Sequence, residues 1–147
     1  MIKSVHILSL VAILILAGIS SCHKDDPKPS AKTELIAKTW KPTGATANGV
    51  DIFSVIDDCE KDDLMKFTKD GKVTFDQSVL KCDPNSPQTE NATWSFQDGE
   101  TKLRINHSDG SSETETISEL SATTLKLSIT DTSQGPPITI VYIFTAQ

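Results

Sequence analysis

Apolar and polar residues alternate with period two along most of the chain from about residue 38 onward. In the segment TLKLSIT, residues 124–130, the leucines and the isoleucine fall on one face and the lysine, serine and threonines on the other. Such runs are typical of half-buried antiparallel strands, and Asn-Gly or Asp-Gly pairs between them mark tight turns. The pattern predicts one helical turn near 32–37 and eight strands at about 38–46, 63–68, 72–77, 91–96, 101–106, 112–119, 123–130 and 138–145.

Consecutive strands joined mostly by hairpins favour an all-β fold, an eight-stranded up-and-down antiparallel barrel, because closure leaves no exposed sheet edge. A two-sheet β-sandwich of immunoglobulin type has a similar strand count and is the alternative. In that sandwich the cysteines stand in mid-strand, whereas Cys59 and Cys82 lie in an acidic and a proline-rich segment. The barrel is therefore the favoured fold.

The residues expected to point into this barrel are mostly large and apolar. A barrel of eight strands is wide enough either to be filled by side chains or to hold one small ligand. About two inward residues per strand favour a filled core, with a ligand pocket as the open alternative. The candidate ligand contacts are Trp40, Phe67, Phe75, Trp94 and Tyr142. The other inward residues are Met65, Val73, Phe96, Leu103, Ile105, Ile117, Leu125, Leu127, Ile129, Ile140 and Phe144.

The first residues have the layout of a secretory signal segment, with a lysine at position 3 and an apolar run over 7–19. That run is shorter than the about 20 apolar residues that a membrane-spanning helix needs. It ends in Ile-Ser-Ser-Cys, which resembles the bacterial lipobox. The resemblance implies a signal peptide over 1–21 and fatty acyl chains, such as palmitate, on Cys22. Cleavage at an ordinary small-residue site, with an incidental thiol at Cys22, is the alternative.

The segment that follows Cys22 is too polar to pack and too rich in proline to form a helix. We expect a lipidated N-terminus and flexible tether over 22–33, followed by a single domain over 34–147. The letters CHKDD resemble a signal that sends lipoproteins to the cell surface in one phylum of Gram-negative bacteria; a solvated charged spacer is the alternative. We therefore expect an outer-membrane lipoprotein of the cell envelope, exposed at the cell surface.

The charge of the chain argues against one class of partner. It carries 14 Lys and Arg against 20 Asp and Glu, and removal of residues 1–21 changes the net charge from −6 to −7 because only Lys3 is lost. Nucleic acids are bound through clustered basic residues, so we expect no nucleic-acid partner. The remaining 126 residues suffice for one domain with its own core, and we expect a monomer.

With Cys22 assigned to lipid, Cys59 and Cys82 form an even pair in an exported and therefore oxidising setting, which predicts a disulfide. A metal site lacks partners, because neither His23 nor His107 lies at ligand spacing from a cysteine. We expect no metal and no cofactor. A calcium site remains a minor alternative to a solvated acidic loop at the carboxylates around Cys59, which are Asp57, Asp58, Glu60, Asp62 and Asp63.

Five segments of the chain are distinctive when taken together: AKTWKPTGATANGV, DDCEKDDLMKFTKDGKVTFD, KCDP, ATWSF and ISELSATTLKLSIT. They resemble the lipocalin-like domains of lipoproteins from that same bacterial phylum, and the resemblance covers residues 34–147. It implies a barrel with room for a pocket, and it brings no settled activity.

The sequence contains none of the common catalytic motifs, and His107 is expected to be an exposed turn residue. We therefore expect no enzyme. The leading hypothesis is a membrane-anchored lipocalin-like module that binds a small apolar or amphipathic ligand in the barrel. The alternative is a structural or adaptor surface domain with a packed barrel, whose loops bind a protein or glycan.

Overall fold

The computed structural model describes residues 29–133 and 135–147 of the chain. The predicted signal peptide, the lipidation at Cys22 and most of the predicted tether therefore lie outside the described residues. Within these residues there are three helical segments: α1 (Ala31–Ile36), the 3-10 turn η1 (Phe53–Val55) and α2 (Asp58–Lys61). Within the part of the chain that the structure describes, no helix is long and apolar enough to cross a membrane.

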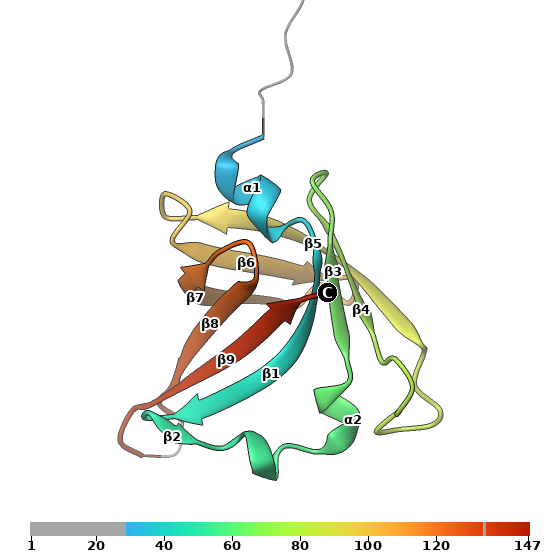
Figure 1. The fold of residues 1–147 in the computed structure, drawn as a ribbon, viewed down its shortest axis with the longest axis vertical. Helices are drawn as coiled ribbons and strands as arrows, with labels where there is room; N and C mark the ends of the chain where they lie inside the picture. Colours follow the sequence, from blue (N-terminus) through green and yellow to red (C-terminus); the bar gives the residue numbers. More distant parts are fainter. Residues whose placement is uncertain (1–28, 134) are drawn as a thin grey trace, which may run out of the picture.

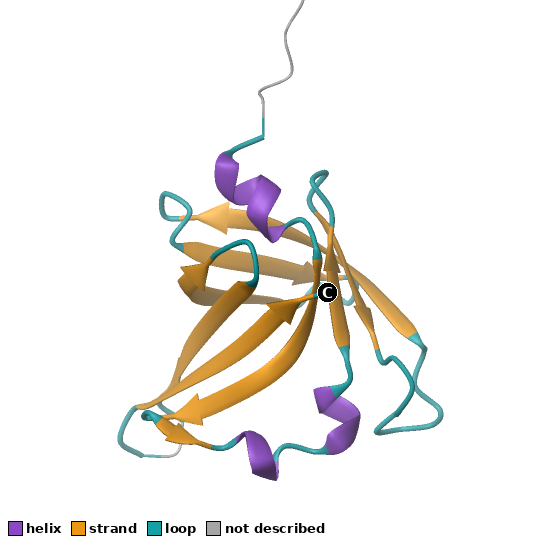
Figure 2. Ribbon diagram, in the orientation of Figure 1, coloured by secondary structure: helices purple, strands orange, loops and turns teal. Residues whose placement is uncertain are grey.

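The rest of the domain is antiparallel sheet (Figures 1 and 2). The strands follow the alternating segments of the sequence, and only the shortest one, β2, was not predicted. Their bounds are β1 Thr39–Ala47, β2 Val50–Asp51, β3 Leu64–Phe67, β4 Lys72–Asp76, β5 Thr89–Gln97, β6 Lys102–His107, β7 Ser112–Leu120, β8 Thr124–Asp131 and β9 Ile138–Ala146.

The strands form one closed meander. Each strand from β3 to β9 pairs with its neighbour in sequence, β1 pairs with β3, and the β1–β9 pairing closes the barrel. This confirms the predicted eight-stranded barrel and excludes the sandwich, with β2 as an additional strand on β1. Asn48 and Gly49 both have positive φ, 47° and 82°, which suits the tight turn that carries the chain from β1 into β2.

A bulge in β1 keeps the inward face of this strand apolar. The register with β9 shifts between Pro42 and Gly44, and proline, which has no N–H to donate, suits such an interruption of the ladder. The extra residue places Ala45 opposite Tyr142 on the inward face, as Pro42 is placed opposite Phe144. Ala45 is consequently buried.

One end of the barrel is closed by α1 (Figure 1). The Ser30 side chain accepts a hydrogen bond from the Thr33 amide and so caps the first turn of this helix. Ile36 at its last turn is fully buried, and its carbonyl accepts a hydrogen bond of 2.8 Å from the indole of Trp40. Lys32 donates to the carbonyl of Glu100 in the β5–β6 turn at 2.7 Å. The helix thus plugs the end at which the β3–β4, β5–β6 and β7–β8 turns lie.

The core lies next to this plug. Its fully buried side chains include Trp40, Leu103, Leu125 and Leu127, and most of the predicted inward set belongs to the same cluster or packs against it. The indole of Trp94 donates to the carbonyl of Thr68 at 3.1 Å. Burial and satisfied hydrogen bonds together make the closed end a well-packed core.

Candidate functional site

The opposite end of the barrel is hollowed by two cavities. Their volumes are about 200 Å³ and about 340 Å³. Four residues line both cavities, which therefore adjoin each other: Glu60, Asp63, Phe75 and Gln77. The smaller cavity also touches the apolar side chains of Met65 and Phe144, and the larger one touches Asp83 and Glu90. We call the two cavities and these eight residues the mouth.

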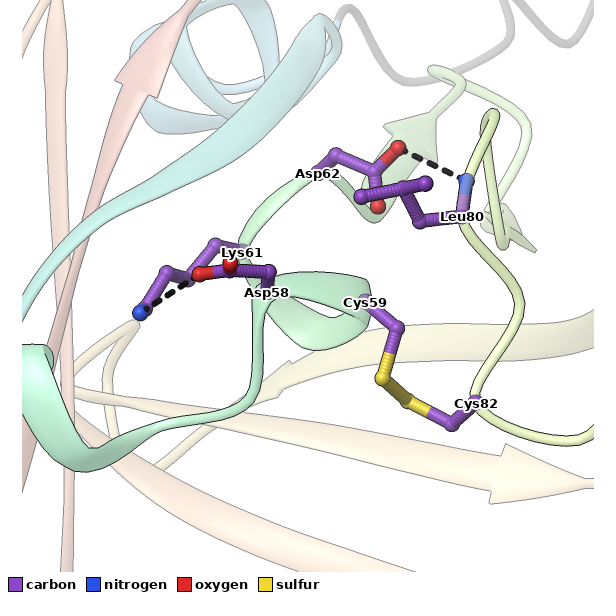
Figure 3. Close-up of a disulfide and its surroundings, with 6 residues drawn as sticks. All are labelled: Asp58, Cys59, Lys61, Asp62, Leu80 and Cys82. Carbon is purple, nitrogen blue, oxygen red and sulfur yellow. Dashed lines mark hydrogen bonds and ion pairs between the residues drawn. A yellow bond between two sulfur atoms is a disulfide. The ribbon is translucent and has the colours of Figure 1, made fainter.

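The rim of the mouth is fastened by the predicted disulfide, which the structure contains. Cys59 in α2 is bonded to Cys82 in the long β4–β5 connection (Figure 3). Asp62 reinforces this link, because one of its oxygens accepts hydrogen bonds of 3.0 Å from the amides of both Val79 and Leu80. The β4–β5 connection is therefore held against α2 at the edge of the cavities.

Three glutamates extend the inward face of the barrel toward this end. Strand register places Glu90 opposite Phe75, Glu113 opposite Ile105 and Glu115 opposite Leu103. Because side chains directly opposite each other in a sheet share a face, these carboxylates point to the same side as the apolar core. Sequence analysis missed them, although continuing the period-two pattern beyond the apolar positions would have found them.

His107 links two of these glutamates, and the expectation that it is an exposed turn residue was wrong. It is the last residue of β6, and its side chain is only 21% exposed. Nδ1 lies 3.1 Å from a Glu90 oxygen and Nε2 lies 3.3 Å from a Glu113 oxygen. Its ring stacks on Phe75, with ring centroids 5.7 Å apart. Burial lowers the pKa of His107, but the two glutamates outweigh this effect, so the pKa is raised.

Two other carboxyl groups at this end are perturbed. Burial, together with the charge of Glu113, raises the pKa of Glu115 to about 7. Burial and the neighbouring charges of Asp62, Glu60 and Asp76 raise the pKa of Asp63 to about 6. One oxygen of Asp63 is also buried without a hydrogen-bond partner. Both groups lack a nearby cation that would offset burial and repulsion.

The acidic loop that raised the alternative of a calcium site is occupied by other contacts. Asp58 pairs with Lys61 at 2.9 Å, and Asp62 accepts a hydrogen bond from the amide of Leu80 (Figure 3) and another from that of Val79. Across residues 29–133 and 135–147, no group of three or more His, Cys, Asp or Glu side chains is arranged to hold a metal ion.

The candidate ligand contacts fall into two groups. Trp40, Phe67 and Trp94 are buried in the packed core, with at most 7% exposure. Phe75 lines both cavities of the mouth. Tyr142 is partly buried between the two ends, and burial together with the charges of Glu115 and Glu60 raises its pKa.

A further hollow of about 560 Å³ lies outside the barrel, over β4, β5 and β6. Its lining includes Thr74, Asn91, Thr93 and Asn106, which alternate with the inward residues and therefore face outward. The hollow shares no residue with the mouth. Its lining also includes two residues of the inward rows, Ala92 and His107, which lie opposite each other.

Comparisons with known proteins agree with this architecture. The family model described as "Lipocalin-like domain" matches residues 36–127. A lipocalin-like protein from Bacteroides uniformis has a similar crystal structure, with a TM-score of 0.51 and 18% sequence identity, over 76% of this chain and 97% of that one. At this identity the likeness shows the fold alone. No curated protein matches the chain.

Proposed function

The chain belongs to the lipocalin-like domain family, and from that premise we propose that it is a membrane-anchored module that binds a small amphipathic ligand in the mouth of its barrel. The proposal rests on the two adjoining cavities. Both are lined by Phe75, by Gln77 and by two carboxylates. Binding sites for small molecules are typically concave and partly apolar, with a few polar groups that fix orientation. The mouth meets that description.

The position of the mouth supports shallow binding. The opposite half of the barrel is filled by side chains such as Trp40, Leu103 and Leu125, so the core leaves little space beyond the two cavities. The apolar part of a ligand would rest on Phe75, Met65 and Phe144. On this proposal Trp40, Phe67 and Trp94 form the packed floor under the ligand.

The proposed anchor places the mouth away from the membrane. We propose that residues 1–21 are removed, that Cys22 carries the lipid and that 22–33 tether the domain to the outer membrane at the cell surface. The described chain enters the barrel at α1, which lies at the end opposite the mouth (Figure 1). A lipid at the N-terminus would therefore leave the mouth facing the surroundings of the cell.

Native mass spectrometry of the protein purified from its own membranes tests both parts of the proposal. We expect acyl chains on Cys22 and a retained small molecule that leaves on unfolding. A wild-type protein heavier than a Cys22→Ala variant by the sulfur atom alone would contradict the anchor. An unliganded barrel that also fails to bind a neutral fluorescent probe would contradict the carrier.

A matched pair of variants localises the binding. Phe75→Ala should weaken binding of a neutral probe such as N-phenyl-1-naphthylamine, because the ring lines both cavities. Thr93→Ala, whose side chain faces outward on β5, should leave the affinity unchanged. Thermal unfolding of each variant verifies that the change in binding is not a loss of fold.

An adaptor role is the second candidate, and it is favoured by the exposed apolar residues of the domain. Val50, Val55, Val79, Leu80 and Ile138 are between 42% and 85% exposed. They belong to β2, η1, the β4–β5 connection and the start of β9, all at the open end (Figure 1). An adaptor would crosslink to a macromolecule in cells from a photoreactive residue at Val55 and not from one at Thr114, which is exposed on β7; a carrier would crosslink from neither.

A further inference from the structure

The side chains of the mouth are unbalanced in charge. Glu60 and Asp63 line both cavities, and Asp83 and Glu90 line the larger one. Neither lining contains a Lys or Arg. Glu113 and Glu115 stand on the same inward face, and the imidazole of His107 lies 3.3 Å from Glu113.

Local partners offset only part of this negative charge. His107 bridges Glu90 and Glu113, and Lys66 pairs with Asp76 at 2.6 Å. Asp63 has no such partner for one of its oxygens, which is buried and accepts no hydrogen bond. The residue nevertheless lines both cavities. A buried acceptor without a donor costs free energy, and a cation at the accessible part of the same side chain would offset the charge of this carboxylate. The mouth therefore needs donors and positive charge.

The mouth also has an apolar side. Met65, Phe75 and Phe144 line the smaller cavity together with Glu60 and Asp63. An alkyl chain can rest on the first three while an ammonium group donates to the last two. A neutral head group would satisfy the acceptors without offsetting their charge, and an anionic head group would be repelled.

We infer that the mouth selects an amphipathic cation, a primary alkylammonium with its head group at Glu60 and Asp63 and its chain against Phe75. The inference rests on the proposed function, since it names the ligand class of the same site. It goes beyond that function because a lipocalin-like barrel as such is equally compatible with neutral and anionic ligands.

Binding of such a cation should release protons. The pKa values of Asp63 and Glu115 are raised to about 6 and about 7, so both groups are partly protonated near neutral pH. A cation favours their charged forms, and its affinity should rise with pH as they ionise. His107, whose pKa is also raised, loses its competing charge in the same direction. The titratable groups that face this end are Glu60, Asp62, Asp63, Asp76, Asp83, Glu90, His107, Glu113, Glu115 and Tyr142. Two lysines lie beside them: Lys66 pairs with Asp76, and Lys81 donates to the carbonyl of Ser86 at 2.7 Å.

The experiment compares three probes of equal chain length. Hexylammonium, hexanol and hexanoate are titrated calorimetrically into the full chain in lipid nanodiscs, with empty nanodiscs as the blank. We expect hexylammonium to bind about tenfold more tightly than hexanol, since a charge-assisted hydrogen bond contributes on that scale, and hexanoate to bind most weakly. Between pH 5.5 and pH 8 the affinity for hexylammonium should rise about threefold or more, and that for hexanol should not change.

Variants locate the head group. Glu60→Gln and Asp63→Asn should each lower the affinity for hexylammonium several-fold and leave that for hexanol within twofold. Glu60 is exposed on α2 and is the variant less able to disturb the fold. Glu119→Gln is the matched control, because Glu119 faces outward and pairs with Lys126 at 2.8 Å.

The outcomes separate the two proposals. If hexanol or hexanoate binds as tightly as hexylammonium, the inference of a cationic ligand is overturned while the carrier function stands. If none of the three probes binds, both are overturned. Equal losses in Glu119→Gln and Asp63→Asn would also overturn the inference, because the effect would then come from net charge and not from the mouth.

Discussion

The two ends of this barrel are built from the same strands and the same inward face, yet they carry different side chains. At the end closed by α1, the inward positions hold Trp40, Leu103 and Leu125, all fully buried. At the open end the same rows of alternating positions continue into Glu90, His107 and Glu113. One end removes apolar surface from water, whereas the other keeps charges beside a cavity.

This contrast separates stability from function. Burial of large apolar side chains is the main favourable term in folding, so most of the stabilisation comes from the closed end. Carboxylates that are partly buried and mutually repelling do not stabilise a fold, and groups with perturbed pKa values cluster at functional sites. The packed core of the closed end therefore holds the side chains of the open end in place.

The largest expected effect tests the closed end. Trp40→Ala should destabilise the domain by about 3 to 5 kcal/mol, through lost transfer free energy and the cavity that it leaves. Urea unfolding followed by circular dichroism measures this change. Val79→Ala at the open end, where the side chain is 85% exposed, should cost less than about 0.5 kcal/mol. Similar costs for both variants would remove the difference between the ends.

The disulfide gives the next largest effect, and it acts on the open end. Cys59 and Cys82 are 23 positions apart, and the chain-entropy model values such a loop at about 3 kcal/mol. The double variant Cys59→Ala/Cys82→Ala should lose stability on that scale. Hydrogen exchange should accelerate in residues 77–88 more than in β6 or β8 beside the core, and uniform acceleration would contradict the account.

The pH dependence of the free energy of unfolding also distinguishes the two ends, and the expected effect is smaller. The folded-state pKa of Glu115, about 7, lies above its usual value of 4.5. Its contribution to stability is therefore fully present below about pH 4.5 and is lost as the pH rises through 7. The loss should be on the order of 1 to 2 kcal/mol after solvent screening. Asp63 and His107 act in the same direction.

Urea unfolding at pH 5 and pH 8 measures this dependence. Glu115→Gln should reduce the difference between the two pH values, because the amide does not ionise, and Glu119→Gln should leave it unchanged. A wild-type domain that is more stable at pH 8 than at pH 5 would show that the acidic groups of the open end do not repel one another as described.

The cap of α1 gives the smallest effect. Ser30→Ala removes the side-chain acceptor for the Thr33 amide and should cost about 1 kcal/mol. Because α1 plugs the closed end, probe binding at the mouth should not change. Fluorescence titration of this variant with N-phenyl-1-naphthylamine tests that independence, and a parallel loss of affinity would mean that the ends are coupled.

The sequence was sufficient to predict the barrel because the evidence for it is local. Period two and Asn-Gly or Asp-Gly turns predicted the strands on which the closure depends, and the cysteine pair predicted the link from Cys59 to Cys82. The two-residue strand Val50–Asp51 was missed because so short a segment has no period. The helical turns around Asp58 were missed because their amphipathic face is too short to detect.

The mouth could be predicted only in part, because it depends on which residues lie opposite one another. Glu115 is of a residue type that is usually solvated, so it was not assigned to the inward face although it lies two positions before Ile117. Its register against Leu103 places it there. Similarly, the turn-like context of His107 gave no indication of Glu90 or Glu113, which come from other strands. Phe75 was correctly placed on the inward face, although its neighbours were not foreseen.

The central claim is that the open end binds the ligand while the closed end remains a packed core. Nuclear magnetic resonance of the isotope-labelled full chain in nanodiscs, titrated with hexylammonium, tests it most directly. We predict chemical-shift changes at Glu60, Asp63 and Phe75, which line both cavities, and none at Trp40 or Leu103. Changes that centre on the core, or on Asn91 and Asn106 of the outer hollow, would contradict the account.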